Sequence, residues 1–143
     1  MAIKLLRFTF LLVAVVTFFS AATFAQSQVK KEPIQMTSPS SGSEMFSSYC
    51  TACHGKDGKG NGPAASALKV SPSDLTQLSK NNNGKFPADH VANVLRSGVA
   101  GAHGSPDMPV WGPLFSSVSN HADSMVQMRI SNLIHYLESI QAK

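Results

Sequence analysis

The sequence is poor in the residues from which most metal and redox sites are built. Its only two cysteines, Cys50 and Cys53, lie close together among 143 residues. A tetrahedral zinc site needs further ligands at motif spacing, and no second C-x-x-C or H-x-x-x-H pair occurs in the chain. A thioredoxin-like dithiol site needs a βαβ context, and no hydrophobic β-run precedes Cys50. A zinc site and a dithiol redox site are therefore poor interpretations of this cysteine pair.

The chain also has only a small excess of positive over negative charge. The formal net charge is +4. Removing residues 1–25 takes away Lys4 and Arg7, so ten of the twelve Lys and Arg remain against eight Asp and Glu, a net charge of +2. No basic run is longer than Lys30-Lys31. We therefore expect no nucleic-acid partner.

Large apolar side chains are few outside the N-terminal segment. Five of the eight phenylalanines fall within residues 1–25. The part of the chain from Gly42 onward is about one hundred residues long, which is one small domain. A domain of this size with so little apolar volume is marginal on its own, and a bound prosthetic group would supply the missing core.

The motif that is present is Cys50-Thr51-Ala52-Cys53-His54. C-x-x-C-H is the attachment signature of c-type haem, in which two thiols add to the porphyrin vinyl groups and the imidazole reaches the iron. Two intervening residues on a helical turn place both sulfurs along one edge of the ring. We therefore expect one haem c per chain, attached through Cys50 and Cys53, with His54 as an iron ligand.

Residues 1–25 have the pattern of an export signal. Lys4 and Arg7 precede an uninterrupted apolar run over residues 8–19, and small residues then lead to an acceptable cleavage site ending at Ala25. This predicts a signal peptide over residues 1–25 and a periplasmic location. The alternative is an uncleaved membrane anchor over residues 8–25, a charge-free stretch of about the 18 residues at which a spanning helix becomes a candidate. A membrane partner is expected only in that case.

Residues 26–41 are rich in Ser, Pro, Gln and Lys and show no apolar periodicity. This composition predicts a flexible tether between the signal peptide and a domain over residues 42–143.

The domain has the pattern of three main helices. Ser43 is a good N-cap for the first, which carries apolar residues at helical spacing into the C-x-x-C-H motif. Residues 55–63 are too rich in glycine to continue it, and they do not have the Walker pattern of a phosphate-binding loop. The second helix starts around residues 86–89, has an apolar face of Val91, Val94 and Leu95, and stops at Gly98. The last runs from Asp123 onward along an apolar stripe.

An irregular loop between the second and last helices contains Met108-Pro109-Val110-Trp111. A thioether is a soft, neutral ligand that can close the sixth position of a haem iron opposite a histidine. A methionine in a loop is more often a core filler, but the other methionines beyond residue 25 fall in the tether or in helices. Pro109 fixes the backbone beside Met108, and the indole N–H of Trp111 is available to donate to a haem propionate.

With these pieces in place, the chain from Gly42 onward resembles the class I monohaem cytochromes c, the small exported Met/His-ligated electron carriers of bacteria. Gly42 and Phe46 match the G-x-x-x-F of that family's first helix, and Leu133-x-x-Tyr136 matches the L-x-x-Y of its last. Met108-Pro109-x-Trp111 resembles the family's M-P-x-W variant. The resemblance implies an all-α fold, a small cytochrome c fold in which three main helices and long loops wrap around one covalently attached haem.

The same resemblance assigns roles to individual residues. Met108 is implied as the distal ligand, and Pro72 occupies the place of the proline whose backbone carbonyl accepts a hydrogen bond from the proximal histidine. The stretch of residues 112–122 matches no motif of the family.

The function expected from these features is one-electron transfer, with iron cycling between ferrous and ferric under His54 and Met108 ligation. Filled axial positions leave no open site for oxygen or peroxide chemistry, so we expect a carrier and not an enzyme. Its partners would be redox proteins, a dehydrogenase or an oxidase, that dock transiently. The alternatives are a five-coordinate haem sensor or peroxidase-like enzyme, and the cytochrome subunit of a larger dehydrogenase or oxidase complex.

Overall fold

The computed structural model describes residues 34–98 and 107–143, and this part of the chain is helical without any strand. It confirms the expected all-α fold. The α-helices are α2 (Gly42–Tyr49), α3 (Thr51–His54), α4 (Ala88–Ser97), α5 (Trp111–Ser117) and α6 (Asp123–Ser139). Three short 3-10 helices lie between α3 and α4: η2 (Ala65–Ala67), η3 (Leu75–Gln77) and η4 (Lys80–Asn82).

The predicted signal peptide of residues 1–25 and the alternative anchor over residues 8–25 lie outside the described ranges. Within those ranges, none of the helices combines the length and the apolar character that crossing a membrane requires.

The helix that leads to the cysteine motif starts earlier than expected and is divided. Its N-cap is Ser41, whose side-chain oxygen accepts from the backbone N–H of Glu44 at 3.2 Å, and not Ser43 as predicted. Two serines two residues apart are equally good caps by composition, and the one that precedes the buried Gly42 is used. Cys50 separates α2 from α3, and its φ widens to −108° with ψ −30° while the residue stays in the right-handed helical region.

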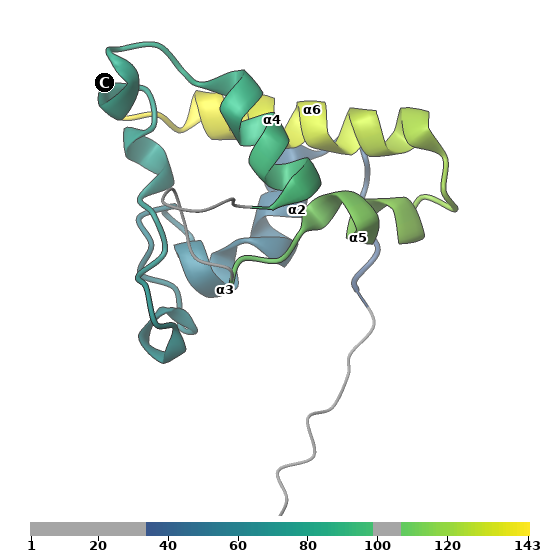
Figure 1. Ribbon diagram of the computed structural model, residues 1–143, viewed down its shortest axis with the longest axis horizontal. Helices are drawn as coiled ribbons and strands as arrows, with labels where there is room; N and C mark the ends of the chain where they lie inside the picture. Colours follow the sequence, from purple (N-terminus) through teal and green to yellow (C-terminus); the bar gives the residue numbers. More distant parts are fainter. Residues whose placement is uncertain (1–33, 99–106) are drawn as a thin grey trace, which may run out of the picture. The chain divides into compact units, whose positions relative to one another are not determined.

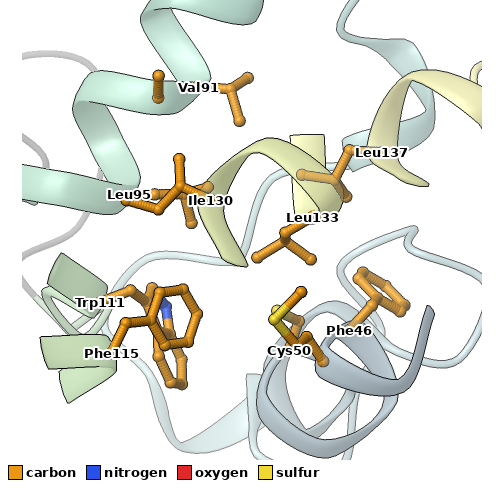
Figure 2. Close-up of a cluster of buried hydrophobic side chains, with 11 residues drawn as sticks. Phe46, Cys50, Val91, Leu95, Trp111, Phe115, Ile130, Leu133 and Leu137 are labelled. Atoms are coloured by element: carbon orange, nitrogen blue, oxygen red, sulfur yellow. The ribbon is translucent and has the colours of Figure 1, made fainter. Parts of the chain in front are cut away.

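Helix α6 is the element around which the domain packs. It contacts α2, α4 and α5, and α4 also contacts α5 (Figure 1). Figure 2 shows Ile130, Leu133 and Leu137 of α6 lying between the side chains of α4 and those of α2 and α5. The fully buried side chains with the largest volumes are those of Phe46, Phe115, Met45, Ile130 and Leu133.

The crossing of α2 and α6 depends on Gly42. A Cβ placed there would overlap the backbone carbonyl oxygen of Asn132 and lie 2.8 Å from Cβ of Tyr136. Below about 3 Å neither group can give way, because one is backbone and the other is fixed at the root of its side chain. The first and last helices therefore touch at the glycine that the family resemblance singled out.

Helix α5 was not expected, since residues 112–122 match no motif. Pro113 lies in the first turn of this helix, where a missing N–H costs nothing, and Gly112 lets α5 approach the backbone of Arg96 in α4. The Gly-Pro pair that reads as a loop signal in the sequence is thus compatible with a helix start. Trp111 and Phe115 of this helix are buried in the core.

Residues 34–41, assigned to a flexible tether by their composition, lie instead against α2 and α6. Thr37 is only 6% exposed. The side-chain amide of Asn132 donates to the carbonyl of Pro39 at 3.0 Å, and the Tyr49 hydroxyl donates to the carbonyl of Gln35. Side chains of α2 and α6 thus bond to backbone carbonyls of residues 34–41. Residues 26–33 lie outside the described ranges.

Candidate functional site

One cavity gathers most of the residues that the sequence singled out. Cys50, Cys53 and His54 line it from α3 and its junction with α2, while Met108 and Trp111 line it from the segment that leads into α5. The rest of the wall is mainly aliphatic and comes from α4, α6 and the segment between η2 and η3, with Leu68, Val70, Leu75, Leu78, Val91, Val94, Leu95, Leu133 and Leu137. The site is therefore an apolar pocket with a thiol pair and an imidazole at one place and a thioether elsewhere on its wall.

Both cysteines are free thiols that face this cavity. Cys50 is buried in the core (Figure 2), and burial, with a smaller contribution from Cys53, raises the pKa of its thiol to about 12. A thiol with such a pKa stays protonated at neutral pH and is a weak nucleophile. Cys50 is thus a poor attacking thiol for dithiol exchange in the folded chain.

The short helix α3 sets the orientation of His54. The backbone N–H of His54 donates to the carbonyl of Cys50 at 2.8 Å, and the helix ends at Gly55, whose φ is +76°. Glycine adopts this φ without strain, so the chain can turn away directly after the histidine. Its side chain is fixed by a second bond, from Nδ1 to the backbone carbonyl of Ser73 at 3.0 Å.

This bond corrects one sequence-based assignment, because the acceptor is Ser73 and not Pro72. Gly60 packs so closely against Pro72 that a Cβ at Gly60 would overlap the Pro72 carbonyl oxygen. The carbonyl of Pro72 faces the glycine loop at Gly60, and the carbonyl of Ser73 accepts from the imidazole. Pro72 still lines the cavity.

The imidazole is prepared for metal binding. Burial lowers the pKa of His54 below its ordinary value of 6.5, and the bond to Ser73 opposes this only in part. The ring is therefore neutral at neutral pH. With Nδ1–H donated to a carbonyl, the lone pair of Nε2 is left for a ligand, which is the usual arrangement of a metal-binding histidine.

Backbone hydrogen bonds hold the glycine-rich loop against the cysteine motif. Gly60 N–H donates to the carbonyl of His54 at 2.8 Å, and Gly62 N–H donates to that of Cys53 at 3.0 Å. The loop in turn accepts from the next segment, since Leu75 N–H donates to the carbonyl of Gly58 at 2.7 Å. The segment that carries Ser73 is thereby tied to the loop that follows His54.

Met108 is half-buried, and it lies outside the helices on the cavity wall. Trp111 is 7% exposed and begins α5, with its ring centroid 5.3 Å from that of Tyr49 and 5.6 Å from that of Phe115. It therefore anchors the Met108 segment to the core. Donation from its indole to a haem propionate stays a prediction.

The residues present fit a covalently attached haem c. The thiols have no disulfide, the neutral imidazole has its outer nitrogen bonded, the wall is apolar, and Met108 supplies a second soft donor. The cavity wall also includes Tyr49 and Ser73, which sequence analysis did not assign to the site. Only Tyr49 had a sequence signal, its position directly before Cys50.

A comparison with protein-family models places residues 37–127 in one match, to the family described as cytochrome C oxidase, cbb3-type, subunit III. No curated protein and no solved structure matches the chain.

Proposed function

The chain belongs to the family described as cytochrome c oxidase, cbb3-type, subunit III, and so carries a c-type cytochrome domain; from this premise we propose that it is a one-electron carrier with a single haem c. His54 and Met108 would ligate its iron, and Cys50 and Cys53 would hold the porphyrin. The haem iron supplies the electron-transfer chemistry by cycling between ferrous and ferric.

The observation that carries the proposal is the composition of one cavity wall. A neutral, hydrogen-bonded imidazole and a thioether from a distant part of the sequence line the same apolar pocket as the thiol pair. Histidine with methionine is the ligand pair of cytochromes that transfer electrons, and methionine raises the reduction potential. Filled axial positions leave no coordination site for a substrate, so turnover is not expected.

The residues of this chain perform three tasks in the proposed function. The cysteines and α3 fix the ring in position, and Ser73 keeps the imidazole in one tautomer by accepting from Nδ1. The aliphatic residues from α4 and α6 exclude water from the pocket. Exclusion of water lowers the reorganisation that accompanies a change of charge, which favours rapid electron exchange.

The partners are redox proteins, and the family description favours an oxidase among them. A carrier that docks transiently and a cytochrome subunit held within a larger oxidase both agree with that description. Gel filtration of a native detergent extract separates the two, since the haem absorbance of a free carrier elutes at the size of this chain alone. Elution with a larger complex would favour the subunit.

The apolar N-terminal run motivates a proposal on location. We expect export to the periplasm with cleavage after Ala25. The intact mass of the protein purified from its host would correspond to residues 26–143 plus one haem. A mass that includes residues 1–25 would instead support the anchor over residues 8–25.

The optical spectrum tests the ligand assignment. We expect a low-spin ferric protein with a sulfur-to-iron charge-transfer band, and loss of this band in Met108→Ala. Met128→Ala is the matched control, because Met128 is 43% exposed on α6 and is absent from the cavity wall. High-spin ferric haem in the wild-type protein would refute six-coordination and support the five-coordinate sensor or peroxidase-like alternative.

A further inference from the structure

Arg129 is a buried cation in the middle of α6. Its side chain is 2% exposed. The guanidinium donates from Nη1 to Oγ1 of Thr37 at 3.0 Å, from Nη2 to the backbone carbonyl of Thr37 at 2.9 Å, and from Nε to Oγ of Ser119 at 3.2 Å. All three acceptor atoms are neutral. Within residues 34–98 and 107–143, no carboxylate forms an ion pair with it.

A cation in this position is costly. Buried charges in proteins are normally paired with an opposite charge, since removal from water costs several kcal/mol per ion. Hydrogen bonds to neutral oxygens satisfy the N–H groups but leave the charge itself uncompensated. The positive field of Arg129 therefore extends into the surrounding low-dielectric core, where it is much less screened than at the surface.

Two connections link Arg129 to residues of the cavity wall. Arg129 precedes Leu133 by one helical turn, and Leu133 lines the cavity. Arg129 is also linked to Tyr49, a second residue of the cavity wall, through Thr37, whose Oγ1 lies 2.7 Å from the Tyr49 hydroxyl.

The hydrogen bonds that connect Arg129, Thr37 and Tyr49 all donate in the same direction, away from Arg129. The single proton of the Tyr49 hydroxyl is donated to the carbonyl of Gln35. The Tyr49 oxygen must therefore accept the proton of the Thr37 hydroxyl, whose own oxygen accepts from Arg129. In this Arg129–Thr37–Tyr49 relay the Thr37 hydroxyl points its positive end toward Tyr49, in the same sense as the field of the cation.

We propose that Arg129 is an electrostatic tuning residue, which raises the reduction potential of the haem by holding an uncompensated positive charge behind the cavity wall. The inference rests on the proposed function, because it concerns the haem held by Cys50, Cys53 and His54. Reduction adds one electron, supplied by a redox partner protein, to ferric iron and breaks no bond. The ferrous state carries one positive charge less, so a nearby cation favours it.

Paired substitutions at Ser119 test the charge without removing Arg129. Ser119→Asp places a carboxylate beside Nε of Arg129, and Ser119→Asn is the uncharged control of nearly the same size. Spectroelectrochemical titration of the holoprotein should show a lower potential for Ser119→Asp than for Ser119→Asn. We expect the equilibrium constant for reduction to differ about threefold to tenfold, tenfold being about 59 mV for one electron.

A second pair removes the cation itself. Arg129→Gln should lower the potential in the same direction, while Arg129→Lys keeps the charge and should stay near the wild-type value. Arg96→Gln removes an exposed arginine that bonds to Gln127, and its effect should be small and should disappear at high salt. The shift caused by Ser119→Asp should depend less on salt, because Arg129 is buried and Ser119 is half-buried.

The result that overturns the inference is an equal potential within both pairs, Ser119→Asp with Ser119→Asn and Arg129→Gln with Arg129→Lys. Purified chain without covalent haem absorbance would refute the proposed function itself, and with it this inference. The two failures are therefore distinguished by the spectrum that precedes each titration.

Discussion

The carboxamide of Gln141 closes the end of α6 onto the segment that supports His54. Its Nε2 donates to the carbonyls of Leu75 and Leu137, both at 2.7 Å, and its Oε1 accepts from the backbone N–H of Ser79 at 2.8 Å. Leu75 and Ser79 lie just beyond Ser73, the acceptor of the histidine. We predict that Gln141→Ala destabilises the holoprotein and loosens the hold on the imidazole.

The magnitude follows from the number of bonds. A typical intramolecular hydrogen bond contributes about 1 kcal/mol net, so loss of the three bonds of Gln141 should cost about 2 to 3 kcal/mol. Water can replace part of this because the site is only part-buried, which favours the lower end. With a guanidinium m-value of about 3 kcal/mol/M for a small domain, about 2 kcal/mol lowers the unfolding midpoint by roughly 0.7 M.

Guanidinium unfolding, followed by far-UV circular dichroism, measures this midpoint. Gln127→Ala is the matched control, since Gln127 is exposed and its side chain accepts from Arg96, so that its removal should shift stability by less than about 0.5 kcal/mol. Acid titration of the haem spectrum should also show release of His54 at higher pH in Gln141→Ala than in the wild type. Identical midpoints for Gln141→Ala and Gln127→Ala would refute the reasoning.

Two further predictions concern single sites. Gly42→Ala should lower the free energy of unfolding by more than about 3 kcal/mol, because the new Cβ overlaps the Asn132 carbonyl, and a variant with the wild-type unfolding midpoint would contradict this close approach. The pKa of Asp74 is lowered, first by the Thr76 hydroxyl and then by its backbone N–H, so Asp74 stabilises the fold above pH 3.8, and that stability is lost as the pH falls through its lowered value. The unfolding midpoint of Asp74→Asn should thus be below that of the wild type at pH 6 and should approach it in strong acid; a pH-independent difference would exclude the ionised carboxylate as its cause.

The features that could be predicted from the sequence are those with a local signal. Helix α4 starts after Pro87 and ends at Gly98, and proline and glycine are the residues that mark helix ends in a sequence. The apolar face of α6 could be predicted from the helical spacing of its apolar residues. The C-x-x-C-H motif can be recognised from five consecutive residues alone. Met108 was found because a proline-flanked methionine in a loop is unusual, and the cavity on whose wall it lies is formed by the whole fold.

Other features were missed or misassigned. No motif predicted α5, whose first turn holds Gly112 and Pro113 because glycine gives the close approach to Arg96 and proline is tolerated in a first turn. The histidine acceptor was assigned to Pro72 by analogy with the family, whereas Nδ1 of His54 donates to the carbonyl of Ser73, one residue further along the chain. An error of one residue in the alignment with the family therefore names the wrong carbonyl as the hydrogen-bond acceptor of His54.

The residues that sequence reasoning missed share a different cause, because their roles depend on contacts between distant parts of the chain. Arg129 lies 92 residues from Thr37, and Gln141 lies 66 residues from Leu75. In the sequence an arginine on an amphipathic helix reads as a solvated residue, and a glutamine near the C-terminus has no signal at all. Their importance arises only when the segment before α2 and the segment after η3 pack on α6. Arg129 and Gln141 thus lie at the flank and beyond the end of α6, while Leu133 and Leu137 of the same helix form part of the cavity wall. Helix α6 therefore combines support, charge and apolar lining. Substitutions along it should change the stability or the reduction potential of the haem protein without replacing a ligand.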